Sequence, residues 1–350
     1  MPAATFLLGD LLVAAESTVA AVEAPGIGES PVGRKSTGMM GALAGETGAF
    51  VSGSETPRYG IGAPPGSAGA SPPEAEAKAA GGAGASAGGT VALSPEAEVK
   101  AAGGTVASAG GVKIAKHGNV AASSASGSAD VLRQAGVVVD LEPAQVKACI
   151  EETNFGFMFA QAYHHAMRHV VPVRRAIGIR TVFNVLGPLS NPAGVKHQML
   201  GVFSKAWLRP MVEVTRALGG ERVLTVHSHN GLDEFSVTHP SDVAELRADG
   251  EIVEYTVNPA DFGMNYRDHS ALQVKSAADS LALIEAVFAR GEPGIGFDML
   301  ALNAASIFYV AGTVAGFAEG VELARAIMRD GRATAQLQRI AACSQRLKGV

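Results

Sequence analysis

Short apolar segments alternate with helix-like segments from about residue 112 onward, and this alternation limits the possible folds more than any other feature of the chain. Four apolar segments have the aliphatic composition of buried strands, namely GGVKIA (110–115), GVVVD (136–140), KHQMLGVFS (196–204) and ERVLTVHS (221–228). Three segments between them show the helical spacing of apolar residues, namely 128–136, 159–179 and 207–220. Strands that alternate with helices predict an α/β fold around a central, largely parallel sheet.

The flanking segments extend this interpretation. Pro172 interrupts the helical pattern of 159–179, and residues 180–194 are predicted to form a strand followed by a turn-rich loop. The tail (301–333) is predicted to be helical, with apolar faces that return to the body of the fold. Near the start, FLLGDLLVAAESTVAAV (6–22) predicts short helices.

Residues 60–111 consist mainly of Gly, Ala, Ser and Pro and contain almost no large apolar side chain. Such a composition buries too little surface to offset the entropy of ordering, so we expect a poorly packed segment. Within it, EAEAKAAGGAGASAGG (74–89) recurs as EAEVKAAGGTVASAGG (96–111) with three differences, and two copies are too few for a solenoid. The chain is therefore divided into an N-terminal helical region (1–59), this low-complexity segment and an α/β domain (112–350).

Net charge and hydropathy exclude several classes of function. A formal net charge of −5 offers no basic surface for the phosphates of a nucleic acid. No apolar run reaches the roughly 18 to 20 residues of a membrane span, and the opening segment carries Asp10 and Glu16 without a basic start. We therefore expect a cytoplasmic protein without a membrane or nucleic-acid partner. Cys149 and Cys343 are too few for a disulfide framework and are expected to pack as small hydrophobic residues.

The loop after the first predicted strand of the α/β domain is the first candidate binding site. It lies in KIAKHGNVAASSASGSADVL (113–132), between a strand end and a helix start, where open α/β sheets gather anionic ligands. Lys116 supplies a cation, Asn119 an amide, and Gly118 and Gly127 permit close backbone approach. Hydroxyl groups follow at Ser123, Ser124, Ser126 and Ser128. This set favours a phosphate ligand, and the alternative is a surface loop that caps a helix.

Two further sets of charged residues are candidates for binding. In VHSHNGLDEFS (226–236), Asp233 and Glu234 follow a glycine turn at a strand exit, and such hard oxygen ligands suit Mg²⁺ held together with waters and phosphates. Arg174 and Arg175 offer guanidinium groups that match a carboxylate. The alternative interpretations are a solvated acidic turn and a solvated helix face.

The histidines and serines give little support for other chemistry. His165 and His169 are four residues apart and His227 and His229 are two apart, but neither pair has an evident third ligand, so a zinc site is not expected. No serine lies in a nucleophile-elbow G-x-S-x-G context, between a predicted strand and a predicted helix, which leaves acyl transfer without support.

Five segments stand out together along the chain, namely VKIAKHGNVAASSASGSADVL, HHAMRHVVPVRRAIGIRTVFNVLGPLSNPAG, VHSHNGLDEFS, NPADFG and LALNAASIFYVAG. In order and spacing they resemble the anthranilate phosphoribosyltransferases of tryptophan biosynthesis, over about residues 111–345. The resemblance implies a homodimer in which a small helical domain, reduced here to a remnant, lies beside a larger α/β domain of the nucleoside phosphorylase and phosphoribosyltransferase type. It also implies transfer of the phosphoribosyl group of phosphoribosyl pyrophosphate (PRPP) to the amine of anthranilate, with Mg²⁺ as cofactor and pyrophosphate as leaving group.

The resemblance also implies roles for individual residues. PRPP would be held by Lys116, His117, Gly118, Asn119, Ser123, Ser124 and Ser128. Asn119 would also face anthranilate, and Arg174 would pair with the anthranilate carboxylate. Asp233 and Glu234 would hold Mg²⁺ against the pyrophosphate. No residue would act as a nucleophile, because a transfer through an oxocarbenium-like state depends on stabilising the leaving group and aligning the amine.

The chain departs from this family mainly in the segments before the first loop. The family's Gly-Thr-Gly-Gly-Asp loop would fall near GGTVA (88–92) and its Asn-x-Ser-Thr segment near EVKA (98–101), and neither matches. Val120, Ala125 and Ser228 also stand where Arg, Lys and Gly are usual. These departures predict weak PRPP binding together with intact anthranilate binding.

Two alternative functions remain open at this point. A non-catalytic member of the fold would keep the scaffold and bind a ligand or a partner. A pyrimidine nucleoside phosphorylase would share the fold but should lack PVRRAIGIRTVFNVLGPLSNPA (172–193), so this segment favours the transferase.

Overall fold

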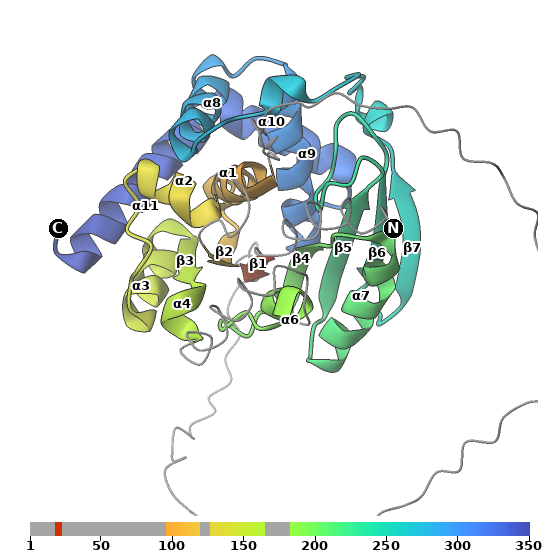
Figure 1. The fold of residues 1–350 in the computed structure, drawn as a ribbon, viewed down its shortest axis with the longest axis horizontal. Helices are drawn as coiled ribbons and strands as arrows, with labels where there is room; N and C mark the ends of the chain where they lie inside the picture. The colour runs from red at the N-terminus through yellow and green to blue at the C-terminus, as the bar shows by residue number, and fades with distance from the viewer. Residues whose placement is uncertain (1–17, 23–95, 120–126, 165–182) are drawn as a thin grey trace, which may run out of the picture. The chain divides into compact units, whose positions relative to one another are not determined.

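A seven-stranded sheet lies at the centre of the computed structural model, which describes residues 18–22, 96–119, 127–164 and 183–350 (Figure 1). The strands are β1 (Thr18–Val22), β2 (Lys113–Gly118), β3 (Phe155–Phe159), β4 (His197–Gly201), β5 (Arg222–Ser228), β6 (Ser241–Leu246) and β7 (Ile252–Val257). Their order across the sheet is β3-β2-β1-β4-β5-β6-β7. Apart from β1, the predicted N-terminal helical region (1–59) lies outside the described residues, as does the low-complexity segment up to residue 95.

Five of these seven strands run in one direction. β2 pairs with β3 and β4 pairs with β5 in parallel, while β1 lies antiparallel between β2 and β4. β6 is antiparallel to both β5 and β7. The predicted α/β class is confirmed. The sheet is largely parallel in strand direction, although only two neighbouring pairs are hydrogen-bonded in the parallel pattern.

Helices cover both faces of the sheet (Figure 1). The described helices are α1 (Glu96–Ala109), α2 (Ser128–Gln134), α3 (Pro143–Thr153), α4 (Ala160–Tyr163), α6 (Phe183–Leu189), α7 (Leu208–Ala217), α8 (Ala277–Arg290), α9 (Ile295–Val310), α10 (Phe317–Arg329) and α11 (Arg332–Lys348). Short 3-10 turns are η1 (Lys205–Trp207), η2 (Pro259–Phe262) and η3 (Ser270–Leu272). Met199 and Leu224 belong to the core shared with α1, α9 and α10, whereas Leu200 and Val223 pack with α7. Successive residues of a strand point to opposite faces of the sheet, so neighbouring residues such as Met199 and Leu200 pack against helices on opposite faces.

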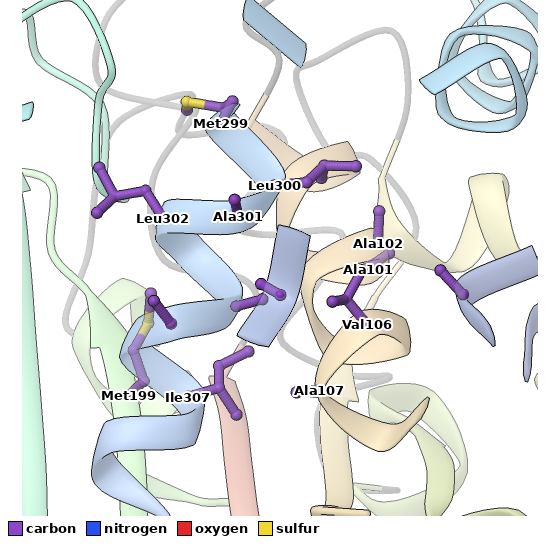
Figure 2. Close-up of a cluster of buried hydrophobic side chains, with 14 of the residues drawn as sticks. Ala101, Ala102, Val106, Ala107, Met199, Met299, Leu300, Ala301, Leu302 and Ile307 are labelled. Atoms are coloured by element: carbon purple, nitrogen blue, oxygen red, sulfur yellow. The ribbon is translucent and has the colours of Figure 1, made fainter. Parts of the chain in front are cut away.

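Helix α1 corrects the expectation of poor packing for residues 96–109, whereas residues 60–95 lie outside the described part of the chain. Its residues Ala101, Ala102, Val106 and Ala107 are at most 3% exposed and lie against α9 in the main core (Figure 2). A side chain at Gly103 would come within 3.7 Å of α9 backbone. Small residues let the two helix axes approach closely, so the composition that suggested disorder instead suits helix packing. The α/β domain therefore begins before residue 112.

Three other segments differ from the sequence prediction. GVVVD (136–140) forms no strand: Gly136 lies in a turn, residues 137–140 have no regular secondary structure, and the backbone N–H of Val138 donates to Ser344 Oγ (2.9 Å). The strand predicted at the start of 180–194 is helix α6 from Phe183 onward. The end of the predicted helical segment 6–22 is strand β1.

The predicted tail and the two cysteines agree with the structure. The predicted tail (301–333) contains the greater part of α9 and the whole of α10, and both helices contribute to the main core. Cys149 and Cys343 are buried in one small apolar cluster. Burial raises the pKa of the Cys149 thiol to about 12, which keeps it protonated at neutral pH.

No single helix in the described part of the chain is long and apolar enough to cross a membrane. Helices α8 and α9 reach the required length and hydropathy only as a pair, with a bend of 88° between them.

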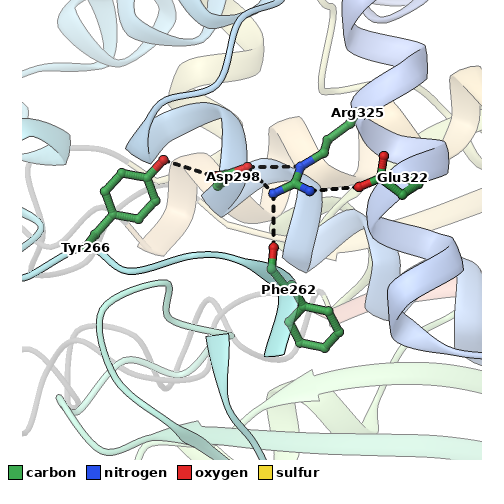
Figure 3. Close-up of polar contacts among 5 residues, drawn as sticks. All are labelled: Phe262, Tyr266, Asp298, Glu322 and Arg325. Atoms are coloured by element: carbon green, nitrogen blue, oxygen red, sulfur yellow. Dashed lines mark hydrogen bonds and ion pairs between the residues drawn. The ribbon is translucent and has the colours of Figure 1, made fainter. Parts of the chain in front are cut away.

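A buried ion pair joins α9 to α10 and to the turn after η2 (Figure 3). Arg325 donates to Asp298 Oδ1 at 2.7 Å and to the Phe262 carbonyl at 3.5 Å, and Tyr266 OH donates to Asp298 Oδ2 at 2.8 Å. The Asp298 side chain is only 6% exposed and that of Arg325 16%. These contacts hold α9 and α10 together near the edge of the main core.

We expect Arg325→Met to lower the free energy of unfolding by about 3–5 kcal/mol, because it leaves the Asp298 carboxylate buried without its cation. Urea denaturation measures this change. The double variant Arg325→Met/Asp298→Asn should recover a large part of the loss, since it removes the buried charge as well. Equal losses in the single and double variants would contradict the assignment of the cost to the stranded carboxylate.

Candidate active site

The carboxyl ends of β2, β3, β4 and β5 lie at one edge of the sheet, because these strands run in the same direction. Thr18 of β1 pairs with His117 of β2 on one side and with Leu200 of β4 on the other. The ends of β2 and β4 are therefore two strand spacings apart, about 10 Å. Ligands of open α/β sheets bind outside such carboxyl ends.

Lys116 is fully buried in β2, two residues before the strand ends. It lies in the same cross-sheet row as Met199 of β4, since Val19 of β1 pairs with both. Met199 belongs to the core under α1 and α9, so Lys116 points to that face. A buried ammonium group at the end of a strand suits a site that binds an anion.

The next residues of the predicted loop reach the edge of the sheet. Gly118 is the last residue of β2, and the half-buried Asn119 accepts a hydrogen bond from Gln161 Nε2 at 3.2 Å. Ser128 is buried as the first residue of α2, whose N-cap is Gly127. Ser123, Ser124, Ser126, Arg174 and Arg175 lie outside the described residues.

His117 contacts a histidine that sequence reasoning did not single out. Its Nε2 lies 3.1 Å from Nε2 of His164, which directly follows α4. Burial, together with the nearby His164 and Lys116, lowers the pKa of His117 to about 4. His117 is therefore neutral at pH 7, and only the fold of β3 and α4 could have brought these two rings together.

The lowered pKa of His117 predicts a loss of stability in acid. The unfolded chain, in which the pKa is 6.5, binds more protons than the folded chain between about pH 6.5 and pH 4. The free energy of unfolding should therefore fall by up to about 3 kcal/mol as the pH drops through this range. Urea denaturation at several pH values measures the slope, and His117→Gln should flatten it. An unchanged slope in the variant would assign the acid sensitivity to other groups.

Asp233 and Glu234 are buried, with exposed fractions of 2% and 0%. They lie in the loop between β5 and β6, and the Ser228 N–H closes the start of this loop by donating to the Leu232 carbonyl at 2.8 Å. The alternative of a solvated acidic turn is wrong. Two buried carboxylates in adjacent positions supply hard oxygen donors of the kind that bind a divalent cation.

Gly201 and Asn303 hold this loop, and sequence reasoning missed both. A Cβ atom on Gly201, the last residue of β4, would lie 1.8 Å from the Asp233 carbonyl oxygen. The Asn303 side chain of α9 bonds both backbone groups of Phe235. A side chain at Gly201 would point to the same face of the sheet as that of Met199, two residues earlier in β4. The Lys116 side chain points to this face as well. The carboxylate loop and Lys116 therefore meet the same face and the same edge of the sheet.

The donor set suits Mg²⁺, which binds through one or two carboxylates and completes its shell with waters and phosphates. Asp233 and Glu234 supply two such carboxylates at the edge where Lys116 lies. Among the described residues no group of three His, Cys, Asp or Glu side chains could hold a metal on its own. His227 Nδ1 lies 2.9 Å from the Val202 carbonyl oxygen and His229 Nε2 3.0 Å from an Asp242 carboxylate oxygen, so these two histidines are engaged elsewhere.

Comparison with known proteins identifies similar sequences. The model of a glycosyl transferase family, α/β domain, matches residues 86–334. The anthranilate phosphoribosyltransferase of Thioalkalivibrio sulfidiphilus is 50% identical over 228 residues, which are 65% of this chain and 67% of that protein. The enzyme of the same name from Rubrobacter xylanophilus is 47% identical over 238 residues, 68% of this chain and 69% of that protein.

Solved structures agree with these sequence matches. The anthranilate phosphoribosyltransferase of Thermus thermophilus has a TM-score of 0.65 and 42% identity, over 71% of this chain and 73% of that one. The Saccharomyces cerevisiae enzyme in complex with PRPP and Mg has a TM-score of 0.64 and 27% identity, over 71% of this chain and 69% of that one.

Proposed function

The chain belongs to the anthranilate phosphoribosyltransferases, within the glycosyl transferase family, and we propose that the edge formed by β2 to β5 is its active site. The reaction forms a bond from the amine of anthranilate to C1 of the ribose of PRPP and breaks the bond from C1 to pyrophosphate. The observation that carries the assignment of this edge is the buried pair Asp233 and Glu234 on the same face as Lys116.

Two groups of residues would hold the two ends of PRPP. Lys116 and the residues after it in the β2–α2 loop would bind phosphate oxygens by charge and by hydrogen bonds. Asp233 and Glu234 would bind Mg²⁺, which neutralises negative charge on the departing pyrophosphate when it is bound. The separation of about 10 Å between the ends of β2 and β4 suits a substrate with phosphates on both sides of a ribose.

The chain's own residues would act by position and charge. Anthranilate is a weakly basic aromatic amine and needs no strong general base for its attack. Asn119, at the end of β2, would face the amine, and Arg174 would fix the anthranilate carboxylate, as the family resemblance implies. Neutral His117 would add no positive charge to that of the adjacent Lys116. Holding the amine in line with C1 converts a bimolecular step into an effectively unimolecular one.

A fluorescence assay tests the function directly. Anthranilate is fluorescent, so its consumption in the presence of PRPP and Mg²⁺ reports transfer. The proposal predicts turnover that requires all three components. Binding of anthranilate without any turnover would instead favour a non-catalytic member of the fold.

The family resemblance also implies a homodimer, and the sequence predicts a cytoplasmic location from its hydropathy and opening segment; we propose both for this chain. Light scattering of the purified protein tests the first, and fractionation of the producing cells tests the second.

A further inference from the structure

We infer that Asn303 is a positioning residue that, together with Gly201, fixes the Asp233–Glu234 carboxylates at the Mg²⁺ site. The inference rests on the proposed function, because it concerns the carboxylates assigned there to the metal. Asn303 lies in the middle of α9, and it is 2% exposed. It touches none of the reacting groups, so its role would be exerted through the loop that it holds.

The Asn303 amide satisfies both backbone groups of the residue that follows the carboxylate pair. Its Oδ1 accepts from the Phe235 N–H at 3.1 Å, and its Nδ2 donates to the Phe235 carbonyl at 2.9 Å. Nδ2 also donates to the Met299 carbonyl one turn earlier in α9, at 3.0 Å, which fixes the amide itself. Two hydrogen bonds to one residue set the rotation of its peptide groups. They therefore set the direction in which Glu234 leaves the backbone.

Gly201 acts on the same loop from the sheet. An added Cβ there would lie 1.8 Å from the Asp233 carbonyl oxygen, 2.8 Å from its carbonyl carbon and 3.1 Å from its Cβ. The two shorter contacts are to backbone atoms, which cannot rotate aside as a flexible side chain can. The Asp233 backbone is thus seated directly on the end of β4, and the loop is held from α9 on one side and from β4 on the other.

The competing explanation is that Asn303 is an ordinary buried amide that stabilises the core. Ser306 provides a matched control, because its hydroxyl is also buried in α9 and donates to the Asn303 carbonyl at 2.7 Å. The Ser306 hydroxyl hydrogen bond stays within α9, whereas the Asn303 amide crosses to the loop. A purely structural role predicts the same kind of effect for both residues.

Mn²⁺ binding, followed by the electron paramagnetic resonance of free Mn²⁺, separates the two explanations without an activity measurement. Asn303→Ala and Gly201→Ala should each raise the Mn²⁺ dissociation constant roughly tenfold to a hundredfold, as loss of groups that orient metal ligands does. Ser306→Ala should leave this constant unchanged. Anthranilate binding, followed by its fluorescence, should be unchanged in all three variants.

Two other results would contradict the positioning role or the metal site. If Asn303→Ala and Gly201→Ala lower only the urea midpoint, and bind Mn²⁺ as the unaltered protein does, the positioning role is wrong. If the unaltered protein binds no Mn²⁺, the metal assignment of Asp233 and Glu234 is wrong, and the proposed site fails with it. The Gly201 variant acts from the opposite side of the loop, so it carries the test should the Asn303 variant not fold.

Discussion

Asp233→Asn is expected to lower kcat/KM for PRPP by about 10²- to 10³-fold, while anthranilate binding stays unchanged. The substitution keeps the shape of the side chain and removes its negative charge. A neutral amide binds Mg²⁺ less strongly than a carboxylate does, so charge on the departing pyrophosphate would be less well stabilised.

The fluorescence assay, run over a range of Mg²⁺ concentrations, measures this effect. Asp261→Asn is a suitable control, because it makes the same change at an exposed position in η2. Higher Mg²⁺ should recover part of the activity of the Asp233 variant if the loss is one of metal affinity. Full activity of Asp233→Asn at low Mg²⁺ would show that the metal is held elsewhere.

The alternation of apolar and polar residues along the chain predicted which segments contribute to the site, but not how those segments pack. The run from Lys116 to Asn119 was predicted to lie in the loop after a strand that ends at residue 115, whereas strand β2 continues to Gly118, so only Asn119 lies beyond the strand. The pair Asp233 and Glu234 could be proposed as ligands, but its burial could not be predicted. Burial follows from the packing of the loop on Gly201, in a strand that lies earlier in the chain.

Long-range contacts account for most of what sequence reasoning missed. Asn303 bonds a residue 68 positions away, and nothing in the helical periodicity of its segment distinguishes it from a polar residue facing solvent. Helix α1 consists mainly of small residues, a composition that predicts disorder when the sequence is considered alone. Its packing against α9 in the main core could not be predicted from that composition. Strand β1 pairs with segments about 100 and 180 residues further along the chain, which no local pattern reports.

The direction of β1 bears on how strongly PRPP can be held. β1 occupies the place between β2 and β4 but runs antiparallel to both. Thr18, at its start, therefore lies beside His117 at the active-site edge, and Val22, at its end, lies beside Lys113 at the opposite edge. Phosphate-binding loops of open α/β sheets follow the carboxyl end of a strand. β1 itself therefore presents its amino end, and not its carboxyl end, at the active-site edge.

We therefore expect a dissociation constant for PRPP, measured with Mg²⁺ by calorimetry, at least about 100-fold higher than that of the Thermus thermophilus relative. The family's Gly-Thr-Gly-Gly-Asp loop would fall near residues 88–92, where this chain has GGTVA. A hydrogen bond to a charged group contributes about 1.5–3 kcal/mol, so losing one or two of them accounts for a change of this size. Anthranilate affinity, measured by fluorescence titration of both proteins, should agree within about threefold, because Asn119 and Arg174 are retained. Equal PRPP affinities would mean that another part of this chain holds the pyrophosphate, and equal weakening of both ligands would point to a general defect of the site.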